Sequence, residues 1–364
     1  MTVRAETQSE QQLKQALKLH QTGALREAAQ IYNRVLASEP ENAEALHLSG
    51  LLAHQGGRAG EAITQIQRAV DLRPTSKTFL NNLAAVLVSI DQFTKAIECY
   101  QKIIALDPMD HMAFFNLGNL HQRLGRIDVS IGAYREVIKI KPEHIEALHN
   151  LGAAYLANRE HEQAIKCLRT ALELNSEAAQ IHFSLSNVYR STGEMNNAIQ
   201  SLVKALEIKP DFIDARFNLA NVYKELGDYS AAIEHYAALL KCEPAMAEAH
   251  NNLGNVFYIL KQEKHALQCY QTALRLKQDY PEALLNTSIV FQDKGQYDHA
   301  INHCQKAIQL NPEYEPAYAS LVHQMRQACA WEDLEELDRQ VDRFTQKALS
   351  TNRRPSENPF LNIS

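Results

Sequence analysis

The sequence predicts an all-α solenoid: a right-handed superhelix of about nine helix-turn-helix repeats, each 34 residues long. Three observations predict this fold. Prolines are spaced by multiples of 34 residues, small residues recur at one position within that period, and bulky residues recur four positions later. A fixed period of this length is typical of stacked two-helix units, none of which can bury its apolar face alone.

The prolines set the register of the repeats. They are Pro40, Pro74, Pro108, Pro142, Pro210, Pro244 and Pro312, and every interval is 34 residues or twice 34. The two missing prolines are replaced by Ser176 and Gln278. We let each repeat end two residues after its proline, so the first repeat covers 9–42 and the ninth covers 281–314. Position numbers below count from the first residue of a repeat.

Within the repeat, each position has a structural reason. Position 20 is alanine except at Ser130, which is also small, and this allows two helices to approach closely. Position 15 is glycine in six repeats, which suits a left-handed residue at the end of the first helix. The proline then ends the second helix. Position 24 carries the bulky partner of position 20: Tyr32, Tyr100, Tyr134, Tyr236 and Tyr270.

The two ends of the array differ from its middle. Gln12 and Gln15 stand at positions that are apolar in other repeats, as expected of a solvent-facing cap. Residues 315–328 predict one further first helix, and 331–348 predict an amphipathic helix that covers the last repeat. We therefore predict a superhelix over 1–314, capping or linker helices over 315–349, and a flexible tail over 350–364.

Composition gives an ordinary soluble profile. Of 364 residues, 45% are hydrophobic and 22% charged, and the net charge of −6 gives no electrostatic reason to bind nucleic acid or anionic lipid. The first residues are polar and the apolar runs are short, so we expect neither a signal peptide nor a membrane span, and a cytoplasmic location. The six cysteines form no C-x-x-C pair, which indicates reduced packing residues.

No catalytic motif is present. The sequence lacks the glycine-rich nucleotide loops, the H-E-x-x-H metal motif and the G-x-S-x-G nucleophile motif. His299 and His303 are spaced to share a metal, but no acidic or cysteine ligand follows at a familiar spacing, so solvated or packing histidines are the better interpretation. We predict no catalytic residue, no cofactor and no metal site.

These repeat positions resemble the tetratricopeptide-repeat (TPR) family over nearly the whole chain. The resemblance implies that the first helix of each repeat lines a concave inner surface. Three rows of residues would then face that surface. Position 6 contributes Asn82, Asn116, Asn150, Asn218, Asn252 and Asn286, with Ser184 between them; position 9 contributes Asn119, Asn187, Asn221 and Asn255; and position 5 contributes Phe115, Phe183 and Phe217.

Rows of carboxamides predict binding of an extended peptide. Each amide has one acceptor and two donors and can bond a peptide backbone with little regard for side chains. The alternative is that these asparagines only satisfy neighbouring turns. Because each hydrogen bond contributes little and peptide ordering opposes it, we expect affinities of about micromolar or poorer. Position 2 adds an acidic edge that favours basic or neutral segments: Glu44, Glu146, Asp214, Glu248 and Glu282.

One specialised binding mode is disfavoured. TPR clamps for chaperone tails use a lysine at position 5, where this chain has His47, Asn81, Phe115 and other residues but never lysine. Without that counter-charge a terminal carboxylate loses its main partner.

A second resemblance is to the TPR region of O-GlcNAc transferase-like proteins. It rests on the asparagine row and on the C-terminal segment, where Cys329-Ala330-Trp331-Glu332-Asp333-Leu334 is followed by Arg354-Pro355-Ser356 and Asn358-Pro359-Phe360. It implies that the repeats hold a protein substrate for a glycosyltransferase. The family's catalytic lobes have no counterpart in this sequence, so only the substrate-holding asparagines carry over.

Three functional hypotheses follow. The first is a substrate-recruiting module of an O-GlcNAc-transferase-like system. The second is a free-standing scaffold or adaptor that assembles a protein complex without a link to glycosylation. The third is an enzyme, for which only the histidine pair speaks. The expected partners are proteins or extended peptides, not nucleic acid or membrane, and a homodimer stays open because convex surfaces of such arrays often dimerise.

Overall fold

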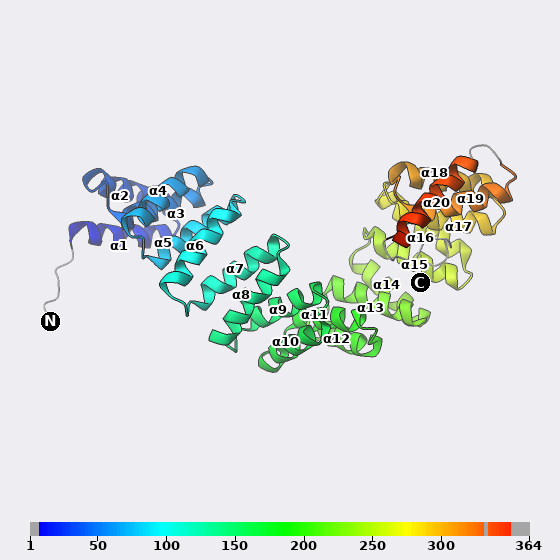
Figure 1. Cartoon of the computed structure of the whole chain (residues 1–364), viewed down its shortest axis with the longest axis horizontal. Coiled ribbons are helices and arrows are strands. Elements are labelled where there is room, and N and C mark those ends of the chain that lie inside the picture. Colours follow the sequence, from blue (N-terminus) through cyan, green and yellow to red (C-terminus); the bar gives the residue numbers. More distant parts are fainter. Residues whose placement is uncertain (1–6, 331–333, 351–364) are drawn as a thin grey trace. The chain divides into compact units, whose positions relative to one another are not determined.

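The computed structural model describes residues 7–330 and 334–350. These contain twenty α-helices, which confirms the all-α prediction and its pairing into helix-turn-helix repeats (Figure 1). The helices are α1 (Gln8–Gln21), α2 (Leu25–Ser38), α3 (Ala43–Gln55), α4 (Ala59–Leu72), α5 (Lys77–Ser89), α6 (Phe93–Leu106), α7 (His111–Arg123), α8 (Ile127–Ile140), α9 (Ile145–Ala157), α10 (His161–Leu174), α11 (Ala179–Ser191), α12 (Met195–Ile208), α13 (Ile213–Leu226), α14 (Tyr229–Cys242), α15 (Ala247–Ile259), α16 (Glu263–Leu276), α17 (Pro281–Asp293), α18 (Tyr297–Leu310), α19 (Glu315–Gln327) and α20 (Leu334–Ser350).

The chain folds as two compact units, residues 1–176 and 177–364. The first contains α1 to α10 and the second α11 to α20. The division falls inside the predicted array 1–314, at Ser176, one of the two places where the repeat lacks its proline. Each unit is therefore a stack of five helix pairs that shares a core between neighbours.

Close packing within a repeat depends on positions 8, 20 and 24. Every position-20 residue, including Ser130, is fully buried. Gly118 at position 8 lies against the ring of Tyr134 at position 24, where an added Cβ would come within 2.6 Å of Tyr134 Cε1. The first and second helices of the repeat therefore approach until the ring rests on backbone, which explains the small and bulky pattern of the sequence.

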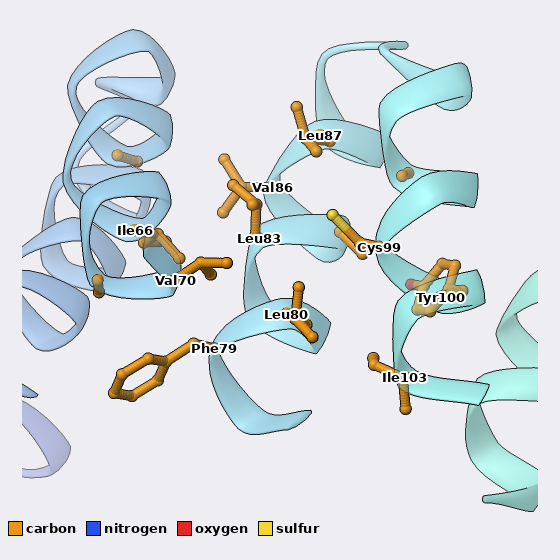
Figure 2. Packing of buried hydrophobic residues seen from close by; sticks show 14 of the residues in the cluster. Ile66, Val70, Phe79, Leu80, Leu83, Val86, Leu87, Cys99, Tyr100 and Ile103 are labelled. Atoms are coloured by element: carbon orange, nitrogen blue, oxygen red, sulfur yellow. The ribbon is translucent and has the colours of Figure 1, made fainter. Parts of the chain in front are cut away.

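The core of unit 1 runs continuously from one repeat to the next. Figure 2 shows Leu80 and Leu83 of α5 between α4, which provides Ile66, and α6, which provides Ile103. These four side chains are at most 2% exposed. At about 25 cal/mol per Å² of buried apolar surface, such shared layers hold the array together.

The turn between the two helices of a repeat uses a left-handed residue at position 15. The six glycines predicted there all have positive φ, for example 69° at Gly125. Asp91, Arg159 and Lys261 occupy the same position in the remaining repeats and also have positive φ, of 59°, 62° and 59°. The conformation thus belongs to the turn rather than to glycine.

The C-terminal helix α20 packs on α19 through its apolar side. Phe344 is 7% exposed and its ring lies 5.2 Å from that of Tyr318. Arg326 Nη2 donates to both carboxylate oxygens of Asp338, at 2.8 and 2.9 Å. Helix α20 begins at Leu334 and extends to Ser350, one residue into the predicted tail. Trp331 and the tail residues that carry the transferase resemblance, from Arg354 to Phe360, lie outside the described residues.

Two further observations concern the surface chemistry. The six cysteines are free, and Cys99 and Cys304 are buried whereas Cys242 and Cys329 are exposed. Within residues 7–330 and 334–350, no helix is both long enough and apolar enough to cross a membrane.

Candidate functional site

The position-6 asparagines form a row in which each amide donates to the preceding repeat. Within unit 1, Asn150 Nδ2 lies 2.9 Å from Asn119 Oδ1. The same bond recurs twice in unit 2, between asparagines 31 residues apart: Asn218 Nδ2 to Asn187 Oδ1 at 3.0 Å, and Asn252 Nδ2 to Asn221 Oδ1 at 2.9 Å. We call the six position-6 asparagines the amide row.

The other members of the amide row reach position 5 of the preceding repeat. Asn286 donates to Asn251 at 2.9 Å and Asn116 to Asn81 at 3.4 Å. Asn82 Nδ2 lies 2.8 Å from Nε2 of His47. All six residues predicted for position 6 therefore bridge to the first helix of the repeat before them.

The position-9 asparagines are fixed by the buried tyrosines of position 24. The Tyr134 hydroxyl donates to Asn119 Oδ1 at 2.7 Å and that of Tyr270 to Asn255 Oδ1 at 2.8 Å; Tyr236 donates in the same way to Asn221. Burial raises the pKa of Tyr134 to about 12, so its hydroxyl keeps its proton. Asn221 and Asn255 are only 9% and 6% exposed.

This arrangement gives the two rows different roles. Position 9 accepts from a tyrosine, from the next amide, or from both, and so orients position 6. Each inter-repeat bond uses one of the two N–H groups of a position-6 amide. It does not use the carbonyl oxygen, which accepts hydrogen bonds, or the second N–H. Position 6 is half-buried in every member of the amide row.

The three phenylalanines of position 5 are also half-buried and pack against rings of the same repeat or its end. The Phe115 ring lies 4.9 Å from His144, and Phe183 lies 5.1 Å from Phe212. Phe217 lies 6.3 Å from Tyr236. These rings support the amide rows from beside and keep part of their edge at the surface.

A groove in unit 2 brings several of these side chains together; we call it the unit 2 groove. It has a volume of about 540 Å³. Amides, tyrosines and charges of both signs line it: Lys224, Glu248, Asn251, Asn252, Asn255, Lys277, Tyr280, Glu282, Leu285, Asn286 and Tyr314. The first helices α13, α15 and α17, which carry most of these residues, contact one another in order.

Unit 1 has a groove of similar size, about 560 Å³, over α5 and α7. Asn81 and Asn116 line it together with Met109 and Met112, which are 65% and 46% exposed. Methionine is an adaptable contact for apolar side chains. This groove therefore combines an amide pair with apolar surface.

The acidic edge of position 2 is partly neutralised. Glu248 Oε1 lies 3.1 Å from Lys277 Nζ, and Glu44 Oε2 lies 3.8 Å from Arg73. Each partner comes from the end of the second helix in the same repeat. The edge thus repels acidic ligands less than the sequence alone indicates.

The histidine pair of α18 is engaged in packing. The rings of His299 and His303 each lie 5.3 Å from the ring of Phe291, and His303 Nδ1 lies 2.7 Å from the carbonyl oxygen of His299. Among the described residues no group of three or more histidine, cysteine, aspartate or glutamate side chains gathers around a point.

Two kinds of groove residue were missed by the sequence reasoning. Lys224 stands at position 12, and Tyr280 and Tyr314 stand at position 34, the last residue of a repeat. Position 34 varies widely along the chain, so its pattern carries no signal. Aromatic residues there could have been found only by asking which loop precedes each amide of the row.

With the repeats and their groove described, comparison with known proteins gives the class. Models of the tetratricopeptide repeat match 13–77, 113–144, 145–177, 247–280 and 281–314, and a further TPR model matches 86–125, 186–227 and 220–261. Between residues 13 and 314 only 78–85 and 178–185 are left unmatched. The chain belongs to the tetratricopeptide-repeat family.

Solved structures with the same kind of fold are TPR proteins. A tetratricopeptide repeat protein from Parabacteroides merdae is 17% identical, with a TM-score of 0.56 over 69% of this chain and 99% of its own. MamA is 28% identical and covers 49% of this chain and 99% of its own, with a TM-score of 0.43. YrrB, described as a TPR protein with an unusual peptide-binding site, is 21% identical over 52% of this chain and 97% of its own, with a TM-score of 0.45. No curated protein gave a match.

Proposed function

We propose that this TPR protein holds an extended polypeptide segment along the amide row, by hydrogen bonds to the backbone of that segment. The observation that carries the proposal is the bond from each position-6 amide to the preceding repeat. It fixes the side chain and leaves its carbonyl oxygen and second N–H for a ligand. Pre-oriented amides lose little rotamer entropy on binding, which favours affinity.

The grooves supply the rest of the contact. In unit 2 the amides of Asn252 and Asn286 stand beside the rings of Tyr280 and Tyr314, which offer flat apolar surface with a polar end. In unit 1 exposed methionines stand beside Asn116. Backbone bonding along the row with side-chain contacts at intervals gives broad selectivity, so we expect micromolar affinity.

The proposal is tested with a phage-displayed library of random 12-residue peptides, selected on the whole chain. Selected peptides are synthesised with a fluorescent label and titrated by anisotropy against wild type and the triple variant Asn150→Ala, Asn218→Ala, Asn252→Ala. Loss of several backbone bonds, each worth about 0.5–1.5 kcal/mol, predicts at least a tenfold weaker affinity.

A control with the same composition separates binding from folding. Asn33, Asn196 and Asn302 are exposed and stand on the second helices α2, α12 and α18. Their triple alanine variant keeps wild-type affinity. Circular dichroism checks that both variants retain their helices. If the amide-row variant binds the selected peptides as tightly as the control does, the proposal is wrong.

The biological setting is a finer question. As a substrate-recruiting module, the chain would present the held segment to a glycosyltransferase, as the resemblance of its sequence implies; as a scaffold, it would hold a defined partner. Capture from the source cell by wild type and by the amide-row variant, followed by mass spectrometry, distinguishes them. A glycosyltransferase or many glycosylated proteins lost with the variant favours the first, whereas a few partners bound equally by both favours the second.

A further inference from the structure

The unit 2 groove contains a lysine whose charge has no partner of opposite sign. Lys224 lies near the end of α13, is half-buried and lines the groove together with Asn252 and Asn286. Among residues 7–330 and 334–350, no carboxylate lies within 4.0 Å of its ammonium. Burying a charge without a partner is costly, and proteins seldom retain such an arrangement without a use for it.

The charges around Lys224 satisfy one another rather than Lys224. Arg190, one repeat earlier, has its Nε 3.6 Å from Glu225 Oε1. Across the groove, Lys277 is paired with Glu248 and its ammonium lies 4.6 Å from the Tyr280 ring centre. Burial is the largest influence on the pKa of Lys224 and lowers it; the nearby Glu225 raises it and Arg190 lowers it.

We propose that Lys224 receives the side-chain carboxylate of an aspartate or glutamate within the segment held by unit 2. This inference rests on the proposed function and adds a charge to its ligand. A carboxylate would satisfy both the ammonium and the adjacent amide donors, because Asn252 and Asn286 present N–H groups to the same groove. Hydrogen bonds between charged groups are about twice as strong as neutral ones.

An internal residue fits this place better than a chain end. Amide pairs lie on both sides of Lys224 along unit 2, Asn187 with Asn218 before it and Asn251 with Asn286 after it. A segment that bonds to both pairs passes Lys224 and continues. The acidic group that meets the lysine is then a side chain rather than a terminal carboxylate.

The peptide selection described above supplies the probe. On phage the library peptides have no free carboxyl end, so any acidic preference comes from side chains. We expect aspartate or glutamate to be enriched at one place in the aligned peptides selected on the wild-type chain. The best peptide is then synthesised with an amidated C-terminus, alone and with its acidic residue changed to the amide.

Three variants of the full chain give the result. With wild type, changing Asp to Asn in the peptide weakens binding about tenfold. With Lys224→Met the two peptides differ by less than twofold, and with Lys224→Arg the preference for Asp persists. Lys204→Met is the control, since Lys204 is exposed on α12 and paired with Glu207 at 3.1 Å; it keeps the tenfold difference.

Three outcomes overturn the inference: no acidic enrichment, a preference for Asp that survives Lys224→Met, or binding only of peptides that end in a free carboxylate. Thermal unfolding shows whether Lys224→Met is folded, and Lys224→Arg tests the charge independently. If Lys224 has no effect but the amide-row variant loses binding, only this inference fails. If the amide-row variant also binds normally, the proposed function fails with it.

Discussion

At position 15 of each repeat the backbone is left-handed whichever residue occupies it. An L-residue other than glycine loses roughly 1 kcal/mol in this region, because its Cβ crowds the following carbonyl. Arg159 has φ of 62° and an exposed side chain, so little else depends on its identity. The cost of its conformation can therefore be measured.

We predict that Arg159→Gly stabilises unit 1 by roughly 0.5–1 kcal/mol, the relief of strain being partly offset by the extra freedom of glycine in the unfolded chain. The reverse change, Gly125→Ala at φ of 69°, destabilises by a similar amount. Urea denaturation followed by circular dichroism measures both. Equal midpoints for wild type and Arg159→Gly would mean that the turn is not strained.

The contact between Gly118 and Tyr134 leaves no room for a methyl group. Gly118→Ala places a Cβ 2.6 Å from Tyr134 Cε1 and forces the ring, which also bonds Asn119, to move. We predict a loss of about 1–3 kcal/mol, typical of overpacking, despite the higher helix propensity of alanine. Gly132→Ala on α8, where an added Cβ meets nothing within 4 Å, is the control and is neutral or stabilising. Thermal unfolding compares them.

A buried histidine makes unit 1 sensitive to acid. His47 is 3% exposed, its Nδ1 has no hydrogen-bond partner among the described residues, and burial lowers its pKa from 6.5 to about 4. Because the folded pKa lies below the unfolded one, protonation favours unfolding. The stability contributed by neutral His47 is complete above pH 6.5 and is lost as pH falls toward 4.

We predict that this loss amounts to about 3 kcal/mol, since each pKa unit is worth about 1.4 kcal/mol. His47→Phe removes the titrating group and keeps a ring at a position where three other repeats carry phenylalanine. Hydrogen exchange in α3 and α5 between pH 7 and pH 4 detects the change. If the variant and wild type lose protection equally, other groups cause the acid sensitivity.

At the scale of the element, α20 takes the place of the next repeat. A solenoid needs a terminal helix with one apolar and one polar face, because the last stacked helix pair otherwise exposes its core side. Phe344 and Leu334 supply the buried side of α20. The bond between Arg326 and Asp338 joins its polar side to α19.

We predict that Phe344→Ala destabilises the C-terminal end of unit 2 by about 3 kcal/mol, through lost burial and a cavity beside Tyr318. Asp338→Asn, which removes only an exposed charge pair, costs less than about 1 kcal/mol. Limited proteolysis followed by mass spectrometry shows whether cleavage first appears within α19 and α20. An unchanged cleavage rate in Phe344→Ala would show that α20 contributes no protection.

The elements were accessible to sequence reasoning because their signals repeat. A single proline or alanine predicts little, but Ala28, Ala62 and their equivalents at the same place in other repeats exclude any other periodic fold. The amide partners were not accessible. Asn150 bonds 31 residues back whereas Asn286 bonds 35 residues back, and the choice depends on how two helices are offset. Likewise, the isolation of Lys224 depends on Arg190 taking Glu225.

At the scale of the molecule, the division at Ser176 has an energetic meaning. Stability in a repeat array is roughly the sum of repeat and neighbour terms, so a stack of five pairs carries most of its own stabilisation. The sequence showed one uninterrupted period and gave no reason to divide it, apart from the missing proline. Two units with separate cores are the structural finding.

We predict that fragments 1–176 and 177–364 each fold alone, with circular dichroism spectra whose sum reproduces that of the whole chain. Their thermal midpoints fall below that of the whole chain by several degrees, because each fragment has a new uncovered end. A fragment 1–159, which cuts the fifth repeat between its helices, is the control and is less helical per residue. If either half is unfolded, the division is not a boundary of independent folding.

The hydrogen bonds of the amide row all point the same way: the nitrogen belongs to the later repeat and the oxygen to the earlier one. Such a row has polarity, like a strand in a sheet. A polypeptide laid along it presents its own N–H and C=O groups in a different order when it is turned end for end. The two orientations therefore differ in energy, and a segment carried by this protein has a preferred leading end.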